Sequence, residues 1–292
     1  MTGVESVLVV GAGAMGSQIA LVAALAGCDV ALHDVDVDVL ARAERQLRDR
    51  MAQQIVKGRR TPEEVGQAFA RLRFAAELDP VTDVDLVIEA VVEKVDVKRQ
   101  LFADLDRRCP ERTVLASNSS SFVPSAMASA TMRPDRFCNL HFFNPALVMR
   151  CVEVVRGPAT SEATMAAAVG FVERIGKQPV VLDREIPGFV ANRILNAVRD
   201  EAIRLLEGGY ATVEAIDTAC RTALGYPMGP FELMDLTGID IGYLTKQARY
   251  DETGDPADAP SATVRMLVAA GHLGRKTGRG FYTYENDEQG DD

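Results

Sequence analysis

One histidine and one glutamate in this chain have the types and spacing that proton-transfer chemistry needs. His141 opens the run 141–145, and Glu153 lies in the next apolar segment, 152–155. An imidazole can accept a proton near neutral pH when its second nitrogen is held and its cation is stabilised, and a carboxylate on a neighbouring strand can do both. The pair is therefore a candidate catalytic dyad. Taken alone, a histidine beside an apolar run is more often a hydrogen-bonded core residue.

The elements that precede this pair indicate a cofactor. The N-terminus is patterned as strand, glycine-rich turn, helix and second strand, over residues 7–10, 11–16, 17–26 and 30–33. In such a turn Gly11 forms the tight bend, Gly13 lets the backbone approach a pyrophosphate, and Gly16 lets helix and strand pack closely. The phosphates then lie at the helix N-terminus. The turn predicts a dinucleotide site made of Gly11, Ala12, Gly13, Ala14, Met15 and Gly16.

Asp34, at the end of the second strand, distinguishes between cofactors. A carboxylate at this position accepts hydrogen bonds from a ribose 2'-hydroxyl and repels a 2'-phosphate. No Lys or Arg follows before Arg42. NAD is therefore expected rather than NADP. The alternative, an acid that caps the next helix, suits Asp36 or Asp38 better than Asp34.

The composition is that of a globular protein with room for two domains: 292 residues, 47% hydrophobic and 25% charged. The formal net charge of -10 argues against a nucleic acid or an anionic membrane as partner. No apolar run approaches the roughly 20 residues that span a bilayer, and the N-terminus has no basic leader, so a cytoplasmic location is expected. The five cysteines lack Cys-x-x-Cys spacing, so neither a disulfide framework nor a metal site is expected.

Residues 36–72 interrupt the alternation of strands and helices. They are patterned as two helices joined by the turn 57–62, with Thr61 as N-cap and Pro62 at the first helical position. Between residues 41 and 73, nine basic side chains accompany four acidic ones, which gives a local net charge of +5. Such a hairpin is either a solvated helical surface or a contact for a polyphosphate ligand.

The rest of the chain continues the pattern and then changes character. Further strands are expected at 85–89, 113–116, 137–142, 152–155 and 179–182, with helices at 94–109 and 161–175. The pattern predicts an α/β fold, with a Rossmann-like doubly wound sheet over residues 1–187 and the helical hairpin inserted at 36–72. From the turn at 186–189 the periodicity is helical, so an all-α domain is expected over 188–292. Ligands of such sheets lie beyond the carboxyl ends of the strands, where Gly11, Asp34, Glu93 and Ser120 emerge.

Several motifs, taken in order, resemble the L-3-hydroxyacyl-CoA dehydrogenase family, nearest to its bacterial 3-hydroxybutyryl-CoA dehydrogenases. They are the glycine turn 11–16, the run 118–121, the segments of His141 and Glu153, residues 187–189 and 192–193, the turn 226–230 and the segment 274–282. The resemblance covers the chain from the first strand to about Tyr284.

The resemblance implies an activity and a set of site residues. The activity is the reversible NAD-linked oxidation of a short (S)-3-hydroxyacyl-CoA, such as 3-hydroxybutyryl-CoA, to the 3-oxoacyl-CoA. His141 would be the general base and Glu153 its orienting partner, while Ser120 and Asn192 would contact the substrate's 3-oxygen. The family pattern also places Asp34, Glu93, Lys98, Ser120, Asn144 and Lys276 near NAD, and Lys57 near the nucleotide end of coenzyme A.

A homodimer is expected as well. Apolar helix surface around Phe189, Ile194, Leu195 and Val198 exceeds what a five-helix unit can bury, and the family resemblance and the prevalence of two-fold assemblies point the same way. The second domain would then serve both substrate binding and dimerisation.

Each implied residue also has an ordinary structural explanation. Ser120 could cap the helix that follows Val123 and Pro124, and Asn192 could be a satisfied amide inside a helix. Glu93 and Lys98 could be charges at a helix end.

The chain departs from the family near the candidate catalytic residues. Ser119 stands where the family usually has Thr, Leu147 where it has Pro, and Arg150-Cys151 where it has Lys-Leu or a similar pair. These departures bear on acyl-chain preference more than on the chemistry. They leave open the same reaction on a 3-hydroxyacyl group carried by an acyl carrier protein. A non-catalytic NAD-binding protein on the same scaffold is a further alternative.

Overall fold

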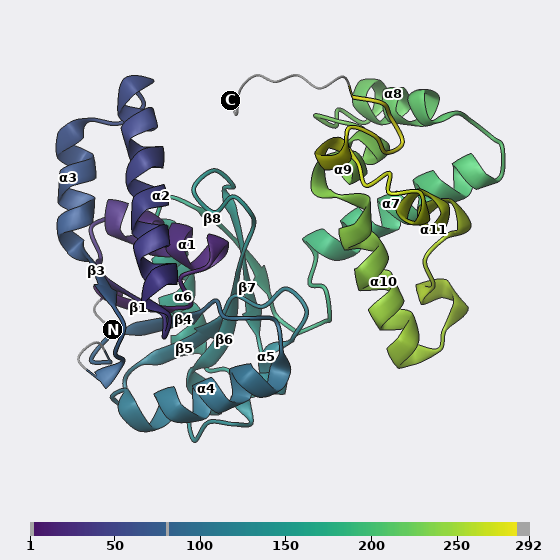
Figure 1. The fold of residues 1–292 in the computed structure, drawn as a ribbon. Coiled ribbons are helices and arrows are strands. Elements are labelled where there is room, and N and C mark those ends of the chain that lie inside the picture. The colour runs from purple at the N-terminus through teal and green to yellow at the C-terminus, as the bar shows by residue number, and fades with distance from the viewer. Residues whose placement is uncertain (1–2, 80–81, 285–292) are drawn as a thin grey trace. The chain divides into compact units, whose positions relative to one another are not determined.

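The computed structural model describes residues 3–79 and 82–284 of the chain. Contacts divide the chain into two compact units, Met1–Val190 and Ala191–Asp292 (Figure 1). The first unit is built on a β-sheet and the second consists of helices, each with its own apolar core. The fold class predicted from the sequence is confirmed.

Eight strands of the described chain form one sheet, in the order β3-β2-β1-β4-β5-β6-β7-β8. Their bounds are β1 Ser6–Val10, β2 Asp29–His33, β3 Leu72–Ala75, β4 Leu86–Glu89, β5 Val114–Ser117, β6 Phe137–Phe142, β7 Cys151–Arg156 and β8 Gln178–Leu182. All neighbours are parallel except β6 and β7, which are antiparallel. The strand order reverses between β1 and β4, and ligands of doubly wound sheets bind at such a reversal.

Strand β3 was not expected, because the predicted hairpin ran to residue 72 and no strand followed it. The segment Leu-Arg-Phe-Ala is short and carries the exposed Arg73, so its pattern is weak. It forms the edge of the sheet by pairing with β2. Tertiary pairing therefore determines this strand more than its own sequence does.

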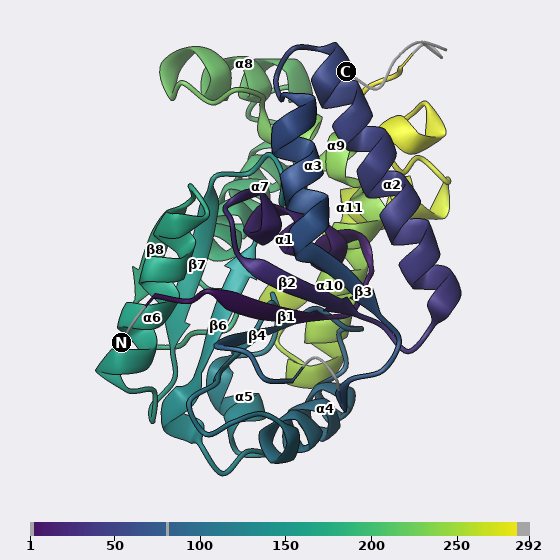
Figure 2. The same cartoon turned by 90° about the vertical axis from the view of Figure 1, so that its left-hand side faces the viewer.

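Helices cover both faces of the sheet (Figure 2). In this unit they are α1 Ala14–Leu25, α2 Val37–Val56, α3 Pro62–Arg71, α4 Val95–Arg108, α5 Pro124–Ala128 and α6 Glu162–Arg174, with a short 3-10 turn at Pro134–Arg136. Side chains of β1 alternate between two cores. Val7 and Val9 join the core of α1 and α6, whereas Leu8 and Val10 join that of α4 and α5. Burial on both faces explains why the central strands are continuous apolar runs.

The inserted hairpin begins and ends at capping residues. Asp36 caps α2 by accepting hydrogen bonds from the amides of Asp38 and Val39. Thr61 caps α3 in a capping box with Glu64, and Pro62 occupies the first helical position, as predicted from the sequence. The helices α2 and α3 run side by side in Figure 2.

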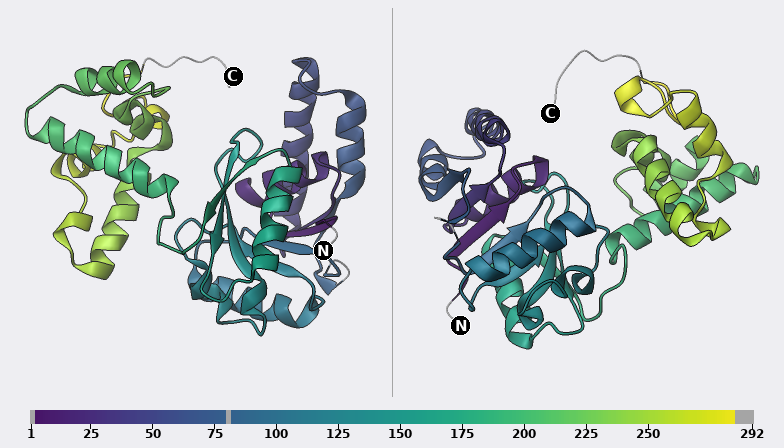
Figure 3. Two further views of the ribbon diagram at one scale, coloured as in Figure 1. Left: turned by 180° about the vertical axis from the view of Figure 1, so that it is seen from behind. Right: turned by 60° about the horizontal axis from the view of Figure 1, so that its bottom comes forward.

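The second unit contains α7 Ala191–Glu207, α8 Val213–Ala223, α9 Pro230–Thr237, α10 Ile239–Thr253 and α11 Ala262–Ala269, with 3-10 turns at Pro256–Asp258 and Arg275–Thr277 (Figure 3). Its core includes Ile203, Phe231 and Ile239, and Phe281 packs against it.

Two buried aspartates attach the segment that follows α11 to this core. Asp217 accepts hydrogen bonds from the Phe231 amide and the Tyr282 hydroxyl, both at 2.9 Å. Asp235 accepts hydrogen bonds from the Tyr282 amide and the Tyr284 hydroxyl, again at 2.9 Å. Burial and the hydrogen bond to Asp235 raise the pKa of Tyr284 to about 12. Asp217 thereby satisfies a backbone donor that the start of α9 leaves free, and Asp235 satisfies one in the segment after α11.

Candidate active site

In the turn between β1 and α1, contacts within the protein require glycine at two positions. Gly11 has φ +103°, and a Cβ built there would lie 2.5 Å from the Ala90 carbonyl oxygen. A Cβ at Gly16 would lie 1.9 Å from the Gly11 carbonyl oxygen. The helix begins at Ala14, so the last residues of the predicted turn belong to its first turn.

Gly13 differs, because nothing in the protein requires a glycine there. It is the N-cap of α1, its φ is -67°, and an added Cβ would meet no atom within 4 Å. The first turn of α1 contains no acidic side chain. A phosphate that approaches the N-terminal amides of a helix needs both this space and this absence of negative charge. The turn therefore fits a dinucleotide pyrophosphate.

Asp34 follows β2 and supports the same turn. Its Oδ2 accepts a hydrogen bond from the Ala12 amide at 2.8 Å, and its Oδ1 accepts one from the Asp36 amide at 3.0 Å. Each carboxylate oxygen can accept a second hydrogen bond, so a ribose hydroxyl can still be bound. Asp36, and not Asp34, caps α2, in agreement with the distinction drawn from the sequence.

Lys98 is buried, although an exposed charge at a helix end was one expectation for it. It is 1% exposed, and its Nζ lies 2.6 Å from Glu89 Oε1, 3.0 Å from Glu93 Oε2 and 3.5 Å from the Val91 carbonyl oxygen. An ammonium has three hydrogen-bond donors, and these acceptors use all three. In this arrangement Lys98 holds Glu89 and Glu93 in place.

The glutamates in turn hold the loop after β5. Glu89 Oε2 accepts a hydrogen bond from Ser117 Oγ at 2.6 Å. Glu93 accepts one from the Ser119 hydroxyl and one from the Ser121 amide. Burial raises the pKa of Glu93, but the hydrogen bond from Ser119 and the charge of Lys98 outweigh it and leave that pKa below its usual value.

Ser120 lies on this loop, between the two serines that contact Glu93. It is exposed, so its hydroxyl is accessible to a ligand. The alternative of a helix cap is wrong, because Val123 is the N-cap of α5 and no side chain caps it.

His141 and Glu153 lie opposite each other in the antiparallel register of β6 and β7. His141 Nδ1 is 2.7 Å from Glu153 Oε2, and the two residues are 5% and 0% exposed. An ionised carboxylate can only accept hydrogen bonds, so a neutral imidazole in this pair carries its proton on Nδ1. The lone pair is then on Nε2, as a general base requires.

The surroundings of this pair are aromatic and come from two further segments. The His141 ring lies 4.5 Å from that of Phe143 and 5.4 Å from that of Phe189, between centroids. Glu153 Oε1 accepts a hydrogen bond from the Val190 amide at 2.9 Å. Phe189 was expected on an exposed helix surface, but it is 0% exposed and belongs to the core of the sheet unit, so that expectation is wrong.

Asparagines border the same end of β6. Asn118 Oδ1 accepts a hydrogen bond from the Phe142 amide at 2.9 Å, which links the serine loop to the strand of His141. Asn144 is exposed in the turn after β6, where its peptide bond to Pro145 is cis. The Leu147 amide donates to Gln18 Oε1 of α1 at 3.3 Å.

The remaining implied residues lie in other parts of the fold. Lys57 is exposed at the C-cap of α2. Asn192 and Lys276 belong to the helical unit, Asn192 at the start of α7 and Lys276 in an ion pair with Asp240 at 2.6 Å. Their roles stay predictions.

Sequence reasoning gave no site role to several residues found here: Glu89, Ser117, Asn118, Phe189 and Val190. Asn118 and Phe189 stood within motifs of the family resemblance. Glu89 was noticed only as the end of a strand, although an acid at the carboxyl end of a buried strand signals a required partner. The backbone amide of Val190 leaves no signal in the sequence.

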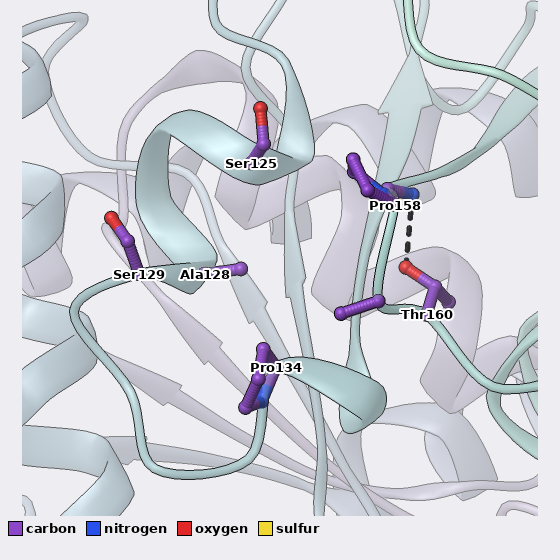
Figure 4. Close-up of a pocket in the computed structure, with 8 residues that line it drawn as sticks. Ser125, Ala128, Ser129, Pro134, Pro158 and Thr160 are labelled. Atoms are coloured by element: carbon purple, nitrogen blue, oxygen red, sulfur yellow. Dashed lines mark hydrogen bonds between the residues drawn. The ribbon is translucent and has the colours of Figure 1, made fainter.

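The pocket in Figure 4 does not belong to this site. It has a volume of about 190 Å³ and lies between α5, the 3-10 turn before β6 and the loop after β7. His141 lies near the other end of β6. Among the residues that the structure describes, no cluster of side chains could hold a metal ion, and no helix is long and apolar enough to cross a membrane.

A doubly wound sheet, a glycine turn at the N-terminus of its first helix and a buried imidazole–carboxylate pair together define a dinucleotide-dependent dehydrogenase. Residues 6–186 match the model for the NAD binding domain of 3-hydroxyacyl-CoA dehydrogenase, and residues 188–284 match that for its C-terminal domain. The chain belongs to the 3-hydroxyacyl-CoA dehydrogenase family of NAD-dependent oxidoreductases, as its motifs suggested.

Relatives match along nearly the whole chain. A probable 3-hydroxybutyryl-CoA dehydrogenase of Bacillus subtilis is 40% identical over 282 residues, which is 97% of this chain and 98% of that protein. The human mitochondrial hydroxyacyl-coenzyme A dehydrogenase is 41% identical over 291 residues, 97% of this chain and 92% of that protein. The crystal structure of (S)-3-hydroxybutyryl-CoA dehydrogenase PaaH1 from Ralstonia eutropha has a TM-score of 0.90 and 36% identity, and covers 97% of this chain and 100% of that one.

The buried ion pair of Lys98 and Glu89 makes a prediction about stability. We expect Lys98→Met to lower the free energy of unfolding by about 3–5 kcal/mol, because it leaves the Glu89 carboxylate buried without its cation. Adding Glu89→Gln should restore part of that loss, since the second charge is then removed too. Urea denaturation of both variants measures this, with the exposed Lys94→Met as control. A Lys98→Met variant as stable as the wild type would contradict the pairing of Lys98 with Glu89.

Proposed function

We propose that the protein catalyses the NAD-dependent, reversible oxidation of a short-chain (S)-3-hydroxyacyl-CoA, such as 3-hydroxybutyryl-CoA, to the 3-oxoacyl-CoA. The observation that carries the proposal is the 2.7 Å contact between His141 Nδ1 and Glu153 Oε2 in a buried pair. The names of the relatives support the substrate class.

The chemistry assigns one task to each group. His141 Nε2 removes the proton of the 3-hydroxyl group, and Glu153 stabilises the imidazolium that results. NAD, held by the glycine turn and Asp34, would supply the acceptor for the hydride that leaves the same carbon. In the reverse direction the imidazolium protonates the alkoxide, and donors from Ser120 and Asn192 stabilise the negative charge on the 3-oxygen. We assign cofactor binding to the sheet unit, with Lys276 as a contribution from the helical unit.

Cofactor binding uses the glycine turn and the carboxyl ends of the strands. The amides at the start of α1 would bind the pyrophosphate, and the Asp34 carboxylate would accept a hydrogen bond from a ribose hydroxyl. Glu93, Ser120 and Asn144 lie on loops at this end of the sheet. Lys98 contributes by fixing Glu93.

The basic hairpin is the proposed contact for the phosphates of coenzyme A. Lys57 and Arg59 are exposed in the turn between α2 and α3, and residues 41–73, which include most of the hairpin and Arg73 of β3, carry a local net charge of +5 on an otherwise acidic protein. The same positive charge would suit an acidic acyl carrier protein. An assay that compares turnover of the CoA thioester with that of the carrier-protein thioester distinguishes the two carriers. Intact His141–Glu153 geometry speaks against a non-catalytic NAD-binding protein.

We also propose a homodimer that uses the helical unit. Ile194 on α7 is 59% exposed, and Ile241 and Leu244 on α10 are 58% and 60% exposed. Large apolar side chains left exposed on two helices support an interface on this unit. The five free cysteines of the described chain fit a reducing, cytoplasmic location.

The general base is tested by replacement. We expect His141→Ala to lower kcat by about 100-fold or more, because it removes the group that exchanges the proton of the 3-hydroxyl. The oxidation of NADH by acetoacetyl-CoA is followed by absorbance, and NADH affinity is measured separately by fluorescence. His272→Ala, at a histidine outside the site, is the matched control. Unchanged turnover in His141→Ala would refute the role of His141 as general base. A folded wild-type protein without turnover of acetoacetyl-CoA would refute the proposed substrate class.

The carrier is tested at Lys57. We expect Lys57→Ala to raise KM for acetoacetyl-CoA about two- to fivefold, the scale of one exposed charge contact, and to leave kcat unchanged. Acetoacetyl-pantetheine lacks the nucleotide phosphates, so its KM should not respond to this substitution. Faster turnover of a carrier-protein thioester than of the CoA thioester would favour the alternative substrate.

The assembly is tested by light scattering of the purified protein. The proposal predicts the mass of two chains, and Ile194→Asp should shift the distribution toward one chain by placing a charge in the interface. A wild type with the mass of one chain would exclude the dimer and leave the chemistry untouched.

A further inference from the structure

The segment that joins β8 to α7 has an unusual backbone beside the candidate dyad. Gly188 has φ +77°, and Phe189 follows with φ +49°. Phe189 is the single non-glycine residue with a positive φ in the described part of the chain. This conformation is unfavourable for a bulky side chain and persists only where the surroundings enforce it, most often at functional sites.

Contacts on both sides of Phe189 enforce it here. On one side, Glu185 Oε2 accepts a hydrogen bond from the Ser125 amide at 2.9 Å, which ties the segment to α5. On the other side, the Val190 amide donates to Glu153 Oε1 at 2.9 Å. Between these anchors the Phe189 ring is 0% exposed and packs with Val155 and Leu182.

The Phe189 ring therefore lies against the His141 imidazole, and the neighbouring Val190 amide contacts the Glu153 carboxylate. Phe189 and Phe143 lie at 5.4 Å and 4.5 Å from the His141 ring, tilted by 53° and 58°. The two oxygens of Glu153 are divided between His141 and Val190. An imidazole packed against two rings and hydrogen-bonded at Nδ1 loses most of its freedom to rotate.

We propose that Phe189 is a positioning residue for the dehydrogenase reaction. Its ring holds the His141 imidazole in line with Glu153, and its left-handed backbone delivers the Val190 amide that fixes the carboxylate. This role rests on the proposed function, because it treats His141 as the base. It also explains why a phenylalanine occupies a position where its backbone is strained.

The test compares Phe189→Leu, which keeps apolar volume but removes the ring, with Phe102→Leu as matched control. Phe102 is likewise 0% exposed, and its ring contacts that of Phe137 in the core of α4 and α5, away from His141. Two quantities are measured: kcat and KM for acetoacetyl-CoA, and the rate at which diethyl pyrocarbonate acylates His141, followed by peptide mass spectrometry. Phe189→Met replaces Phe189→Leu if the latter does not fold.

We expect Phe189→Leu to lower kcat about tenfold with KM unchanged, because a misplaced base loses rate and not binding. His141 should also be acylated faster than in the wild type. The control should leave both quantities near wild-type values. If the ring variant and the control behave alike, Phe189 only fills the core and the inference is overturned. Should the wild type lack turnover, the proposed function fails, while the acylation rates still decide whether Phe189 restrains His141.

Discussion

The hydrogen bond between Glu153 and His141 is the interaction on which the rest of the site depends. A carboxylate buried among apolar side chains is costly unless its oxygens are satisfied, and here one oxygen contacts the imidazole and the other a backbone amide. The same contact leaves the lone pair of the imidazole on Nε2. One pairing therefore stabilises a buried charge and sets the protonation of the base.

The sheet supplies this pairing through its one antiparallel junction. Because β6 and β7 run in opposite directions, His141 and Glu153 occur as directly opposed residues. The parallel part of the sheet places the glycine turn, Asp34 and the serine loop at the carboxyl ends of its strands. A second network fixes that loop: the buried Lys98 pairs with the buried Glu89 and with the partly exposed Glu93, and both glutamates accept hydrogen bonds from serines at the end of β5 or in the loop.

The sequence was sufficient where local rules decide the structure. Gly11, Gly16 and Thr61 have backbone or capping roles that neighbouring residues reveal, and the pattern of apolar runs predicted the doubly wound sheet. It was insufficient where distant segments meet. Strand β3 forms because it pairs with β2 at the edge of the sheet. Phe189 was expected on a helix surface because its partners, Val155 and His141, are distant in the sequence. The burial of Lys98 could not be predicted for the same reason, since its partner Glu89 ends a different element.

The protonation of His141 in the unmodified protein tests the central claim most directly. Nitrogen NMR of ¹⁵N-histidine-labelled protein can assign it, because the chain has only three histidines. At a pH where the ring is neutral, we predict that Nδ1 carries the proton and Nε2 carries the lone pair. A neutral His141 with its proton on Nε2 would contradict the account, because that nitrogen could not then act as the base.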